Sequence, residues 1–308
     1  MHIECAAQPL VNLLGEALED GPVLQMDETS VQVLKERGRP ATAQSYMWVQ
    51  KGGPPGKPTI RYHYAPSRGH EVPKHLLAGF AGYLQTDGYS AYGTALTGRE
   101  DIVAVGCWAH ARRKFDEAIK AHGPKKAKKA GRARQGLTYI QQLYAIEHQA
   151  RDQELDAEAR YQLRQAQARP LLDEMRAWLD DGLTAVPPKS ATGKALTYLA
   201  GQWDRLVRYL DDGRIPIDNN GAENAIRPFV VGRKNWLFAN STAGATASAN
   251  LYSLVETAKA NGHDLYTYLR HIFKELPAAS SAEAYEALLP WNLDPQTLQP
   301  GSQVATDG

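Results

Sequence analysis

The feature that most constrains the fold is a continuous apolar run from Ile102 to Cys107, which is followed at once by a helical pattern. An apolar run without polar alternation is typical of a strand that is buried on both faces. A basic helix is predicted over 109–122, directly after this run. Short strands are predicted earlier in the chain, over 31–34, 45–49 and 59–64. Strands first, then strand–helix alternation, predict an α/β fold whose mixed sheet is covered by helices.

Composition and charge set broad limits on function. The 308-residue chain is 43% hydrophobic and 22% charged, and its formal net charge of +1 does not by itself indicate a DNA partner. The distribution of charge does indicate a DNA partner, because the segment from Trp108 to Arg134 contains ten lysines and arginines and only two acidic residues. Cys5 and Cys107 supply no disulfide framework. Without an apparent signal peptide, or an apolar run of about 18 residues, the protein is expected to be cytoplasmic and to have no membrane partner.

Three acidic residues stand in local contexts that suit metal ligands. Asp27 closes the apolar run 23–26, Asp87 ends the strand predicted after Gly82, and Glu223 lies at the start of a short helix. Two carboxylates at strand ends and a third at a helix start can converge on a pair of divalent cations. Such a pair clamps the attacking and leaving oxygens of a phosphodiester, and hard oxygen ligands suit Mg²⁺ or Mn²⁺. The sequence therefore predicts a nucleic-acid phosphoryl transferase.

A long helical block separates the second acid from the third and divides the chain. Helices are predicted over 136–150, 152–181 and 190–210. The expected domains are a catalytic core over 1–122 and 214–262, a helical insertion over 123–213, a C-terminal helical segment over 263–290 and a disordered tail over 291–308. Pro228 is predicted to end the short acidic helix, and residues 229–238 are predicted to be partly extended.

Six stretches follow one another along the chain: Met26–Thr29, Thr86–Tyr92, Cys107–Phe115, Asn219–Pro228, Gly232–Phe238 and Ser253–Gly262. Together they resemble the transposases of the insertion-sequence 66 (IS66) family, a group within the DDE transposases. The resemblance covers roughly residues 20 to 276, with the insertion where that family has one. Each stretch alone is a weak signal, and the six in order are a strong one.

The resemblance implies an RNase H-like catalytic domain in which Asp27, Asp87 and Glu223 bind two Mg²⁺ (or Mn²⁺) ions. It implies DNA as the partner, both the ends of the insertion sequence and the target, and a homo-oligomer assembled on DNA. Family members usually carry further N-terminal sequence for DNA recognition. The first catalytic strand begins near residue 23 here, so the chain is expected to be N-terminally short. Whether such a core acts on its own stays open.

Each acid also has a purely structural interpretation. Asp27 can be a turn residue after a strand, and Asp87 can cap a helix. Glu223 stands three residues after Asn220, as in a capping box, and four before Arg227, with which it can form a surface ion pair. All three acids lie within the six stretches that follow one another in the order of the family, and this order favours the ligand role for each of them. Glu28 is expected to support the ligands from behind or to face solvent.

Other side chains near these stretches also have both a structural and a functional interpretation. Cys107 and His110 form a Cys-x-x-His pair, but no second pair has the spacing of a zinc site, so a structural role is favoured for the thiol. The lysine-rich segment 125–134 suits a solvated linker and a phosphate-binding segment equally. The residues predicted to contact DNA phosphates flank the catalytic elements: Arg112, Arg113, Lys114, Arg227, Arg233 and Lys234.

The leading hypothesis is a DNA transposase core that hydrolyses the bond at an insertion-sequence end and then transfers the exposed 3′-hydroxyl to target DNA. The alternative is a truncated, catalytically idle transposase that acts only as a DNA-binding protein. A glycoside hydrolase that uses two of the carboxylates is a further rival, and the basic residues that flank the acids argue against it.

Overall fold

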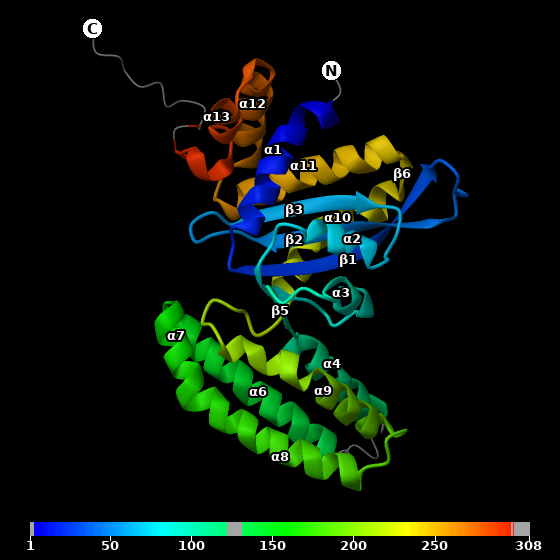
Figure 1. Ribbon diagram of the computed structural model, residues 1–308, viewed down its shortest axis with the longest axis vertical. Helices are drawn as coiled ribbons and strands as arrows, with labels where there is room; N and C mark the ends of the chain where they lie inside the picture. Colours follow the sequence, from blue (N-terminus) through cyan, green and yellow to red (C-terminus); the bar gives the residue numbers. More distant parts are fainter. Residues whose placement is uncertain (1–2, 122–130, 297, 299–308) are drawn as a thin grey trace. The chain divides into compact units, whose positions relative to one another are not determined.

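The computed structural model describes residues 3–121, 131–296 and 298, and its contacts divide the chain into two compact units (Figure 1). Unit 1 comprises Met1–Gly82, Ala91–Ile102 and Gly221–Gly308. Unit 2 comprises Tyr83–Ser90 and Val103–Asn220. Both units are therefore built from segments that are far apart in the sequence.

Unit 1 carries most of the strands. Its elements, in chain order, are α1 (Ile3–Glu19), β1 (Val23–Lys35), β2 (Gln44–Gly52), β3 (Thr59–Ala65), α2 (Glu71–Leu76), α3 (Ser90–Ala95), α10 (Asn220–Trp236), β6 (Phe238–Ser241), α11 (Thr242–Ala260), α12 (Leu265–Glu275) and α13 (Ala282–Glu286), with short 3₁₀ turns at Leu276–Ala278 and Pro290–Asn292. The first residues of α3 and α10 are assigned to unit 2.

The sheet of unit 1 is mixed, as predicted. Strand β2 pairs with β1 and β3 in antiparallel fashion, and β6 pairs with β1 in parallel. The turn 52–56 joins β2 to β3, where Lys57 N donates to Pro54 O over 3.0 Å. The predicted strands over 45–49 and 59–64 are confirmed within β2 and β3.

Strand β1 differs from the prediction, because one strand of 13 residues replaces two short ones. Its polar residues continue the ladder with β2, since Glu28 pairs with Trp48, Thr29 with Met47 and Ser30 with Tyr46. A polar run bounded by two apolar runs looks like a turn in the sequence. Here β2 supplies an apolar partner strand, and the backbone hydrogen bonds of the ladder hold the polar run extended. Asp27 therefore lies inside a strand and not at its end.

One face of this sheet is covered by α10 and α11. The shared core is apolar and joins β1, β2 and β3 to both helices through Val31, Val33, Met47, Val49, Ile60, Tyr62, Ala222, Ala225, Ile226, Phe229, Ala245 and Ala249. The residues of this set that belong to α10 and α11 recur mainly at spacings of three and four, so they share one face of each helix.

Helix α11 also completes the hydrogen bonding of strand β3. Ser253 Oγ accepts from Tyr62 N over 2.8 Å, and Thr257 Oγ1 accepts from Ile60 N over 3.0 Å. Asn261 Nδ2 donates to Pro58 O over 2.9 Å. These three polar residues recur every four positions, so they lie along one face of α11 and satisfy main-chain groups of the strand that a second strand would otherwise bond.

The opposite face of the sheet is covered by short helices. Gln50 Nε2 donates to Leu76 O at the end of α2 over 3.0 Å. The Trp48 ring meets the Tyr92 ring of α3 edge to face, with 5.9 Å between the centroids. A second apolar cluster joins α1 to the C-terminal helices through residues such as Leu10, Leu14 and Tyr268. The mixed sheet flanked by helices is thus confirmed for unit 1.

Unit 2 is mainly helical. Its elements are β4 (Gly82–Gln85), β5 (Ile102–Val105), α4 (Trp108–Ala121), α6 (Gly131–Asp152), α7 (Ala157–Leu163), a π-helical segment (Arg164–Ala168), α8 (Arg169–Ala185), α9 (Ala191–Val207) and a 3₁₀ turn (Arg208–Leu210). The first residues of β4 and β5 are assigned to unit 1. Figure 1 shows α4, α6, α8 and α9 packed as a bundle, and each contacts its neighbours there.

Two predictions for this part of the chain need correction. The helix predicted over 152–181 begins later than expected, because α6 ends at Asp152 and α7 begins only after the N-cap Asp156, whose side chain accepts from Ala159 N. Gly182 does not end a helix and lies inside α8, where its small size lets the side chains of Arg132 and Leu196 approach. The basic helix predicted over 109–122 is confirmed as α4, up to Ala121.

A fully buried arginine ties the bundle to the segment that follows α9. Arg164, in the π-helical segment, makes a two-point ion pair with Glu147 of α6 over 2.8 Å at both contacts. Its remaining donors bond the carbonyls of Tyr209, Asp212 and Ile215 over 2.6 to 2.9 Å. The guanidinium therefore has all five of its donors in use, which offsets the cost of burying a charge.

None of the helices formed by residues 3–121, 131–296 and 298 has both the length and the apolar character needed to cross a membrane. The lysines of the segment 125–129 lie outside the described residues, as do residues 297 and 299–308 of the tail predicted to be disordered.

Candidate active site

Asp27 points to the face of the sheet that α10 covers. Its cross-strand partner is Val49, which belongs to the core shared with α10. Side chains alternate along a strand, so Gln25, Asp27 and Thr29 share this face. Asp27 is half-buried, and its Oδ1 accepts from Glu28 N over 2.9 Å.

Helix α10 lies along this row of β1 side chains. At its start, a Cβ added to Gly221 would lie only 1.9 Å from Gln25 Oε1, so the first turn of the helix lies close to the side chains of the strand. Near its end, Arg233 Nη1 donates to Thr29 Oγ1 over 3.0 Å. Asp27 lies between Gln25 and Thr29 in this row, and Glu223 lies two residues after Gly221. The first turn of α10, which carries Glu223, therefore begins close to the strand that carries Asp27.

Helix α10 contradicts two sequence predictions. Pro228 lies inside the helix and does not end it, and residues 229–236, predicted to be partly extended, are helical. Proline costs about 3 kcal/mol in a helix interior because it lacks an N–H and crowds the carbonyl four residues before it. Packing outweighs that cost here, since Ile226 before the proline and Phe229 after it are buried in the same core.

Asp87 lies in unit 2, just beyond β4. Strands β4 and β5 are neighbours in the sheet. Gly82 N donates to Asp101 O, and Thr86 N donates to Val105 O. Because the residue numbers of both partners increase together, the two strands run in parallel. Asp87 Oδ1 accepts from Tyr89 N over 2.8 Å, a turn that fixes the carboxylate. Gly88 permits this turn with its φ of +87°. Asp87 was predicted at a strand end, and β4 ends two residues before it.

The surroundings of Asp87 within unit 2 include buried hydroxyl and thiol groups. Burial, then the nearby Cys107 and Asp87, raises the pKa of the Tyr198 hydroxyl to about 12, so this group stays a neutral donor at physiological pH. Gln202 of α9 packs against Gly88.

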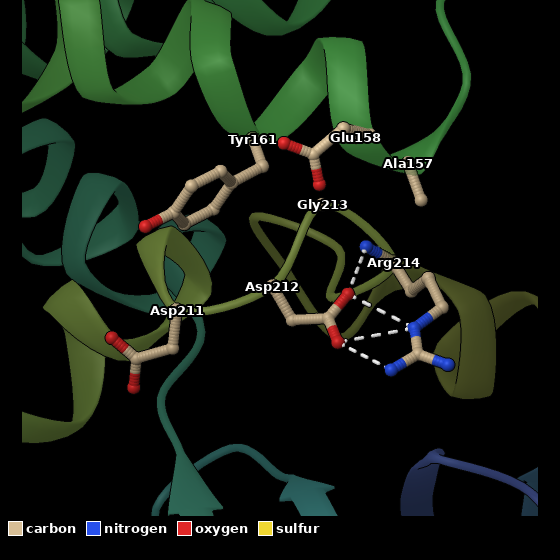
Figure 2. A pocket seen from close by; sticks show the side chains of 7 residues that line it. All are labelled: Ala157, Glu158, Tyr161, Asp211, Asp212, Gly213 and Arg214. Carbon is tan, nitrogen blue, oxygen red and sulfur yellow. Dashed lines mark hydrogen bonds and ion pairs between the residues drawn. The ribbon is translucent and has the colours of Figure 1, made fainter.

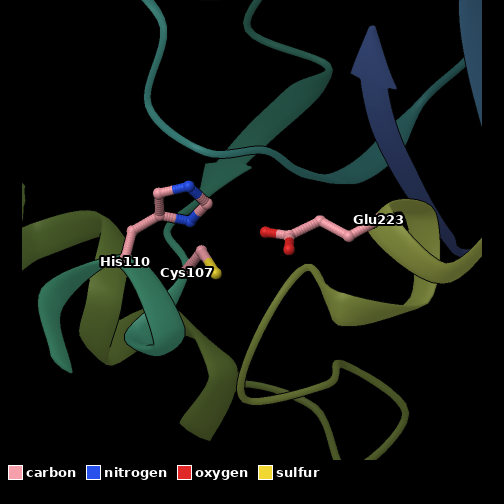
Figure 3. A group of neighbouring side chains, drawn as sticks. All are labelled: Cys107, His110 and Glu223. Carbon is pink, nitrogen blue, oxygen red and sulfur yellow. The ribbon is translucent and has the colours of Figure 1, made fainter. Parts of the chain in front are cut away.

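Cys107 and His110 lie at the beginning of α4, and Figure 3 shows both, together with Glu223 in the first turn of α10. The Cys107 Sγ lies within 4.8 Å of a His110 ring nitrogen and accepts from Asn219 N over 3.2 Å. Burial raises the pKa of the Cys107 thiol to about 11. A thiol that stays protonated is a poor metal ligand, which supports the structural role favoured for it.

Sequence reasoning did not single out Asp218, which organises the start of α10. Its Oδ2 accepts from the Tyr144 hydroxyl over 2.6 Å and from Asn220 Nδ2 over 2.9 Å, and its Oδ1 accepts from Asn220 N over 3.1 Å. Burial, and then the bond to Asp218, raises the pKa of Tyr144. The signal that could have revealed Asp218 is the run Asp218-Asn219-Asn220 before a helix, because such side chains bond neighbouring main-chain groups.

Glu28 does not face solvent. It lies on the opposite face of β1 from Asp27, and its side chain is only 1% exposed. Arg68 reaches Glu28 Oε1 through Nε and Nη2 over 2.7 and 2.6 Å, and the Tyr92 hydroxyl donates to Glu28 Oε2 over 2.6 Å. These bonds hold Glu28 in an internal ion pair.

The six basic residues predicted to contact DNA lie on two helices, α4 and α10. On α4, Arg112 and Arg113 are exposed, and Lys114 makes a 3.4 Å contact with Glu117 along the helix and lies 6.0 Å from the centre of the Tyr198 ring. Such exposed pairs contribute little and do not prevent binding to phosphates. On α10, Arg227 and Lys234 are exposed, whereas Arg233 is half-buried against β1.

A pocket of about 400 Å³ lies elsewhere in unit 2 (Figure 2). It is lined by Ala157, Glu158, Tyr161, Asp211, Asp212, Gly213 and Arg214. Arg214 forms an ion pair with Asp212 over 2.6 Å, and its bonds hold the pKa of that carboxyl below its usual value. None of the residues predicted for the site lines this pocket.

Comparisons with known proteins place these features in a family. Residues 2–247 match the family described as "Transposase IS66 family", and residues 253–291 match the "IS66 C-terminal element". The chain is similar to two proteins of Sinorhizobium fredii, both described only as uncharacterized. One, y4qI, is 33% identical over 96% of this chain, and the other, y4jD, is 32% identical over 92%. The chain spans 56% of the length of each. No solved structure matches the chain.

Proposed function

Because the chain belongs to the IS66 family of transposases, we propose that it is a DNA transposase core, which cuts and joins phosphodiester bonds at insertion-sequence ends. The observation that carries this proposal is the packing of α10 along β1. It brings the first turn of the helix, which carries Glu223, close to the strand that carries Asp27, and this supports the proposal. The proposed place of action is the cytoplasm, on DNA, as a homo-oligomer.

We assign Asp27, Asp87 and Glu223 as the ligands of two Mg²⁺ (or Mn²⁺) ions. The donor set fits, because three carboxylates offer the hard oxygen atoms that these cations prefer. All three side chains are half-buried, so they are accessible to solvent and are held by their surroundings. When bound, the ions would lower the pKa of a water nucleophile and stabilise the charge that develops on the leaving oxygen.

The residues of the chain position the DNA for two successive displacements. In the first, water attacks the phosphorus at an element end, the bond to the 3′ oxygen breaks, and a 3′-hydroxyl and a 5′-phosphate result. In the second, that 3′-hydroxyl attacks a target phosphodiester, so the number of phosphodiester bonds is conserved and no covalent protein–DNA intermediate forms. Arg112, Arg113, Lys114, Arg227, Arg233 and Lys234 are assigned to the phosphates, where they set register and supply salt-dependent affinity.

The same proposal divides the chain by function. An RNase H-like catalytic core would comprise residues 1–122 and 214–262, with residues 123–213 as a helical insertion and residues 263–290 as a C-terminal helical segment. Asp87 lies in the short segment Tyr83–Ser90, and Glu223 follows the chain crossing at Asn220 by three residues, so both acids are close in sequence to points where the chain passes between the units.

Cleavage of a labelled duplex that carries an element end tests the proposal. Asp27→Asn, Asp87→Asn and Glu223→Gln should each lower the rate by at least about a hundredfold with Mg²⁺, and should bind the duplex with nearly unchanged affinity. Asp211→Asn is the control, because this acid lines the separate pocket of unit 2. Near-normal cleavage by any of the three site variants would refute its ligand role.

The alternative, a DNA-binding protein without catalytic activity, gives a different result in the same experiment. The unchanged chain would then bind the duplex and leave it intact with Mg²⁺ and with Mn²⁺. A thermal shift on adding Mn²⁺ separates the cases further, because a ligand that binds the folded state raises the melting temperature. A shift that Glu223→Gln abolishes supports a metal site at this carboxylate.

A further inference from the structure

A second pocket, of about 370 Å³, lies in unit 1 beside the C-terminal end of α10. It is lined by Ser30, Val31, Gln32, Thr42, Ala43, Gln44, Arg233 and Leu237. These residues come from β1, from the connection to β2 and from the end of α10. The pocket is at the small end of the range for sites that hold a small organic group.

The connection between β1 and β2 is fixed, which gives this pocket a defined wall. Gln32 Nε2 donates to Ala41 O over 2.8 Å and spans the hairpin. Arg39 Nη2 donates to Gln44 O over 3.0 Å and closes its other side. The Tyr46 hydroxyl donates to Gln44 Oε1 over 3.2 Å, which orients that amide. The polar wall is thus held in place by local hydrogen bonds.

An exposed apolar residue with an unusual backbone borders the pocket. Leu237 follows α10 with a φ of +65°, in the left-handed region that glycine or asparagine normally occupies after a helix. Its side chain is 62% exposed, and the next residue, Phe238, is 43% exposed. A leucine in this conformation costs about 1 to 2 kcal/mol relative to glycine, and it buries little in return. Strain of this kind tends to be retained where a side chain has a binding role.

The surroundings of the pocket carry positive charge. Between Arg227 and Ser241 there are three basic residues and no acidic residue, and Arg233 is held in the pocket wall by Thr29 Oγ1 and Ser30 Oγ over 3.0 and 3.2 Å. The hairpin adds Lys35, Arg37 and Arg39 against Glu36 alone. A polyanion is the macromolecule that such a surface favours.

We propose that this pocket binds one unpaired base of a DNA strand, with Leu237 against the face of the base. A nucleobase has apolar faces and a polar edge. Leu237 would contact an apolar face of the base. The amides of Gln32 and Gln44, with the hydroxyl of Thr42, would bond the polar edge. A duplex with stacked bases would present only its backbone here. The inference rests on the proposed function, because DNA is the ligand, and it adds recognition of unpaired bases beside the cleavage chemistry.

The test compares two DNA probes of one sequence, a fully paired duplex and a duplex with a short central gap whose unpaired strand contains 2-aminopurine. Binding is measured by fluorescence anisotropy in EDTA, so that cleavage plays no part. The unchanged protein should bind the gapped probe more tightly and change its 2-aminopurine emission. Leu237→Asn keeps a residue that tolerates the left-handed backbone and removes the apolar contact, and it should weaken binding to the gapped probe about fivefold to tenfold. It should leave binding to the paired probe unchanged.

Val231→Asn is the matched control, because Val231 is 53% exposed on α10 and does not line the pocket. Melting temperatures of both variants confirm that they fold. Equal affinity of Leu237→Asn and the unchanged protein for the gapped probe would overturn the inference, and so would an equal loss in Val231→Asn. A failed proposed function gives a separate result, namely no metal-dependent cleavage, and absence of binding to either probe would overturn both.

Discussion

Replacing Arg164 by methionine should destabilise unit 2 strongly, because the arginine is fully buried and all five of its donors are used. Methionine keeps much of the apolar stem and removes the charge. It leaves the Glu147 carboxylate without its cation and leaves three main-chain carbonyls, of Tyr209, Asp212 and Ile215, without this donor. The change therefore isolates the hydrogen bonds and the ion pair from the packing.

The magnitude follows from these contacts. Breaking a buried ion pair by removing one partner costs about 3 to 5 kcal/mol, and each buried carbonyl without a donor adds about 1 to 3 kcal/mol. Water can relieve part of this cost, since the Glu147 side chain is 14% exposed. We expect a loss of at least about 3 to 5 kcal/mol in the free energy of unfolding, the ion-pair contribution alone, with the carbonyl contributions added to the extent that water does not relieve them. The double variant Arg164→Met/Glu147→Met should recover part of the loss, because no buried charge then stands alone.

Urea unfolding measures this change, and Arg176→Met is the control. Arg176 belongs to the same unit, but its pair with Asp180 joins side chains that are 43% and 53% exposed, and its guanidinium lies 5.6 Å from the centre of the Trp203 ring, so its loss should cost at most about 2 kcal/mol. If Arg164→Met were no more destabilising than Arg176→Met, the buried arginine would not hold the segment 209–215. A double variant less stable than Arg164→Met alone would contradict the argument from the unpaired charge.

Three further predictions follow from single residues. Burial, then Arg61 and His75, lowers the pKa of His63 from 6.5 to about 4, so the unfolded state binds more protons between these values. Stability should therefore rise with pH from about 4 to 6.5, by at most roughly 3 kcal/mol, and His63→Gln should flatten this slope in urea unfolding at several pH values. Cys107, with its pKa raised to about 11, should react with iodoacetamide at pH 8 at least about a hundredfold more slowly in the folded than in the unfolded chain, in a background without the other cysteine. Comparable rates would contradict its burial. Pro228→Ala should stabilise the protein by about 1 to 2 kcal/mol if α10 is continuous, and a destabilised variant would argue for the broken helix.

The sequence predicted the elements whose own residues show a strong hydrophobic periodicity. The strands at 45–49 and 59–64 and the helix after Trp108 lie where the patterns indicate. It failed where a partner decides the outcome. The polar residues after Asp27 stay extended because β2 pairs with them, and Pro228 stays helical because the buried side chains on both sides of it hold the helix against the sheet.

The candidate site shows the same limit. Sequence reasoning proposed Asp27, Asp87 and Glu223 as candidates, because each stands beside a recognisable apolar run or helix start, and the family that it indicated is confirmed. It missed Asp218 and Tyr144, since a bond between residues 74 positions apart leaves no local pattern. It left open whether Glu28 supports the ligands or faces solvent, because Arg68, which pairs with Glu28, lies 40 residues away. Partners at long range are set by the fold and not by neighbouring residues.

The most direct test of the central claim is the location of manganese in a crystal of the protein soaked with Mn²⁺, read from anomalous scattering. The account predicts two manganese positions, bound by carboxylate oxygens of Asp27, Asp87 and Glu223 at about 2.0 to 2.3 Å. Manganese bound only at other residues, or three carboxylates too far apart to share an ion, would contradict it.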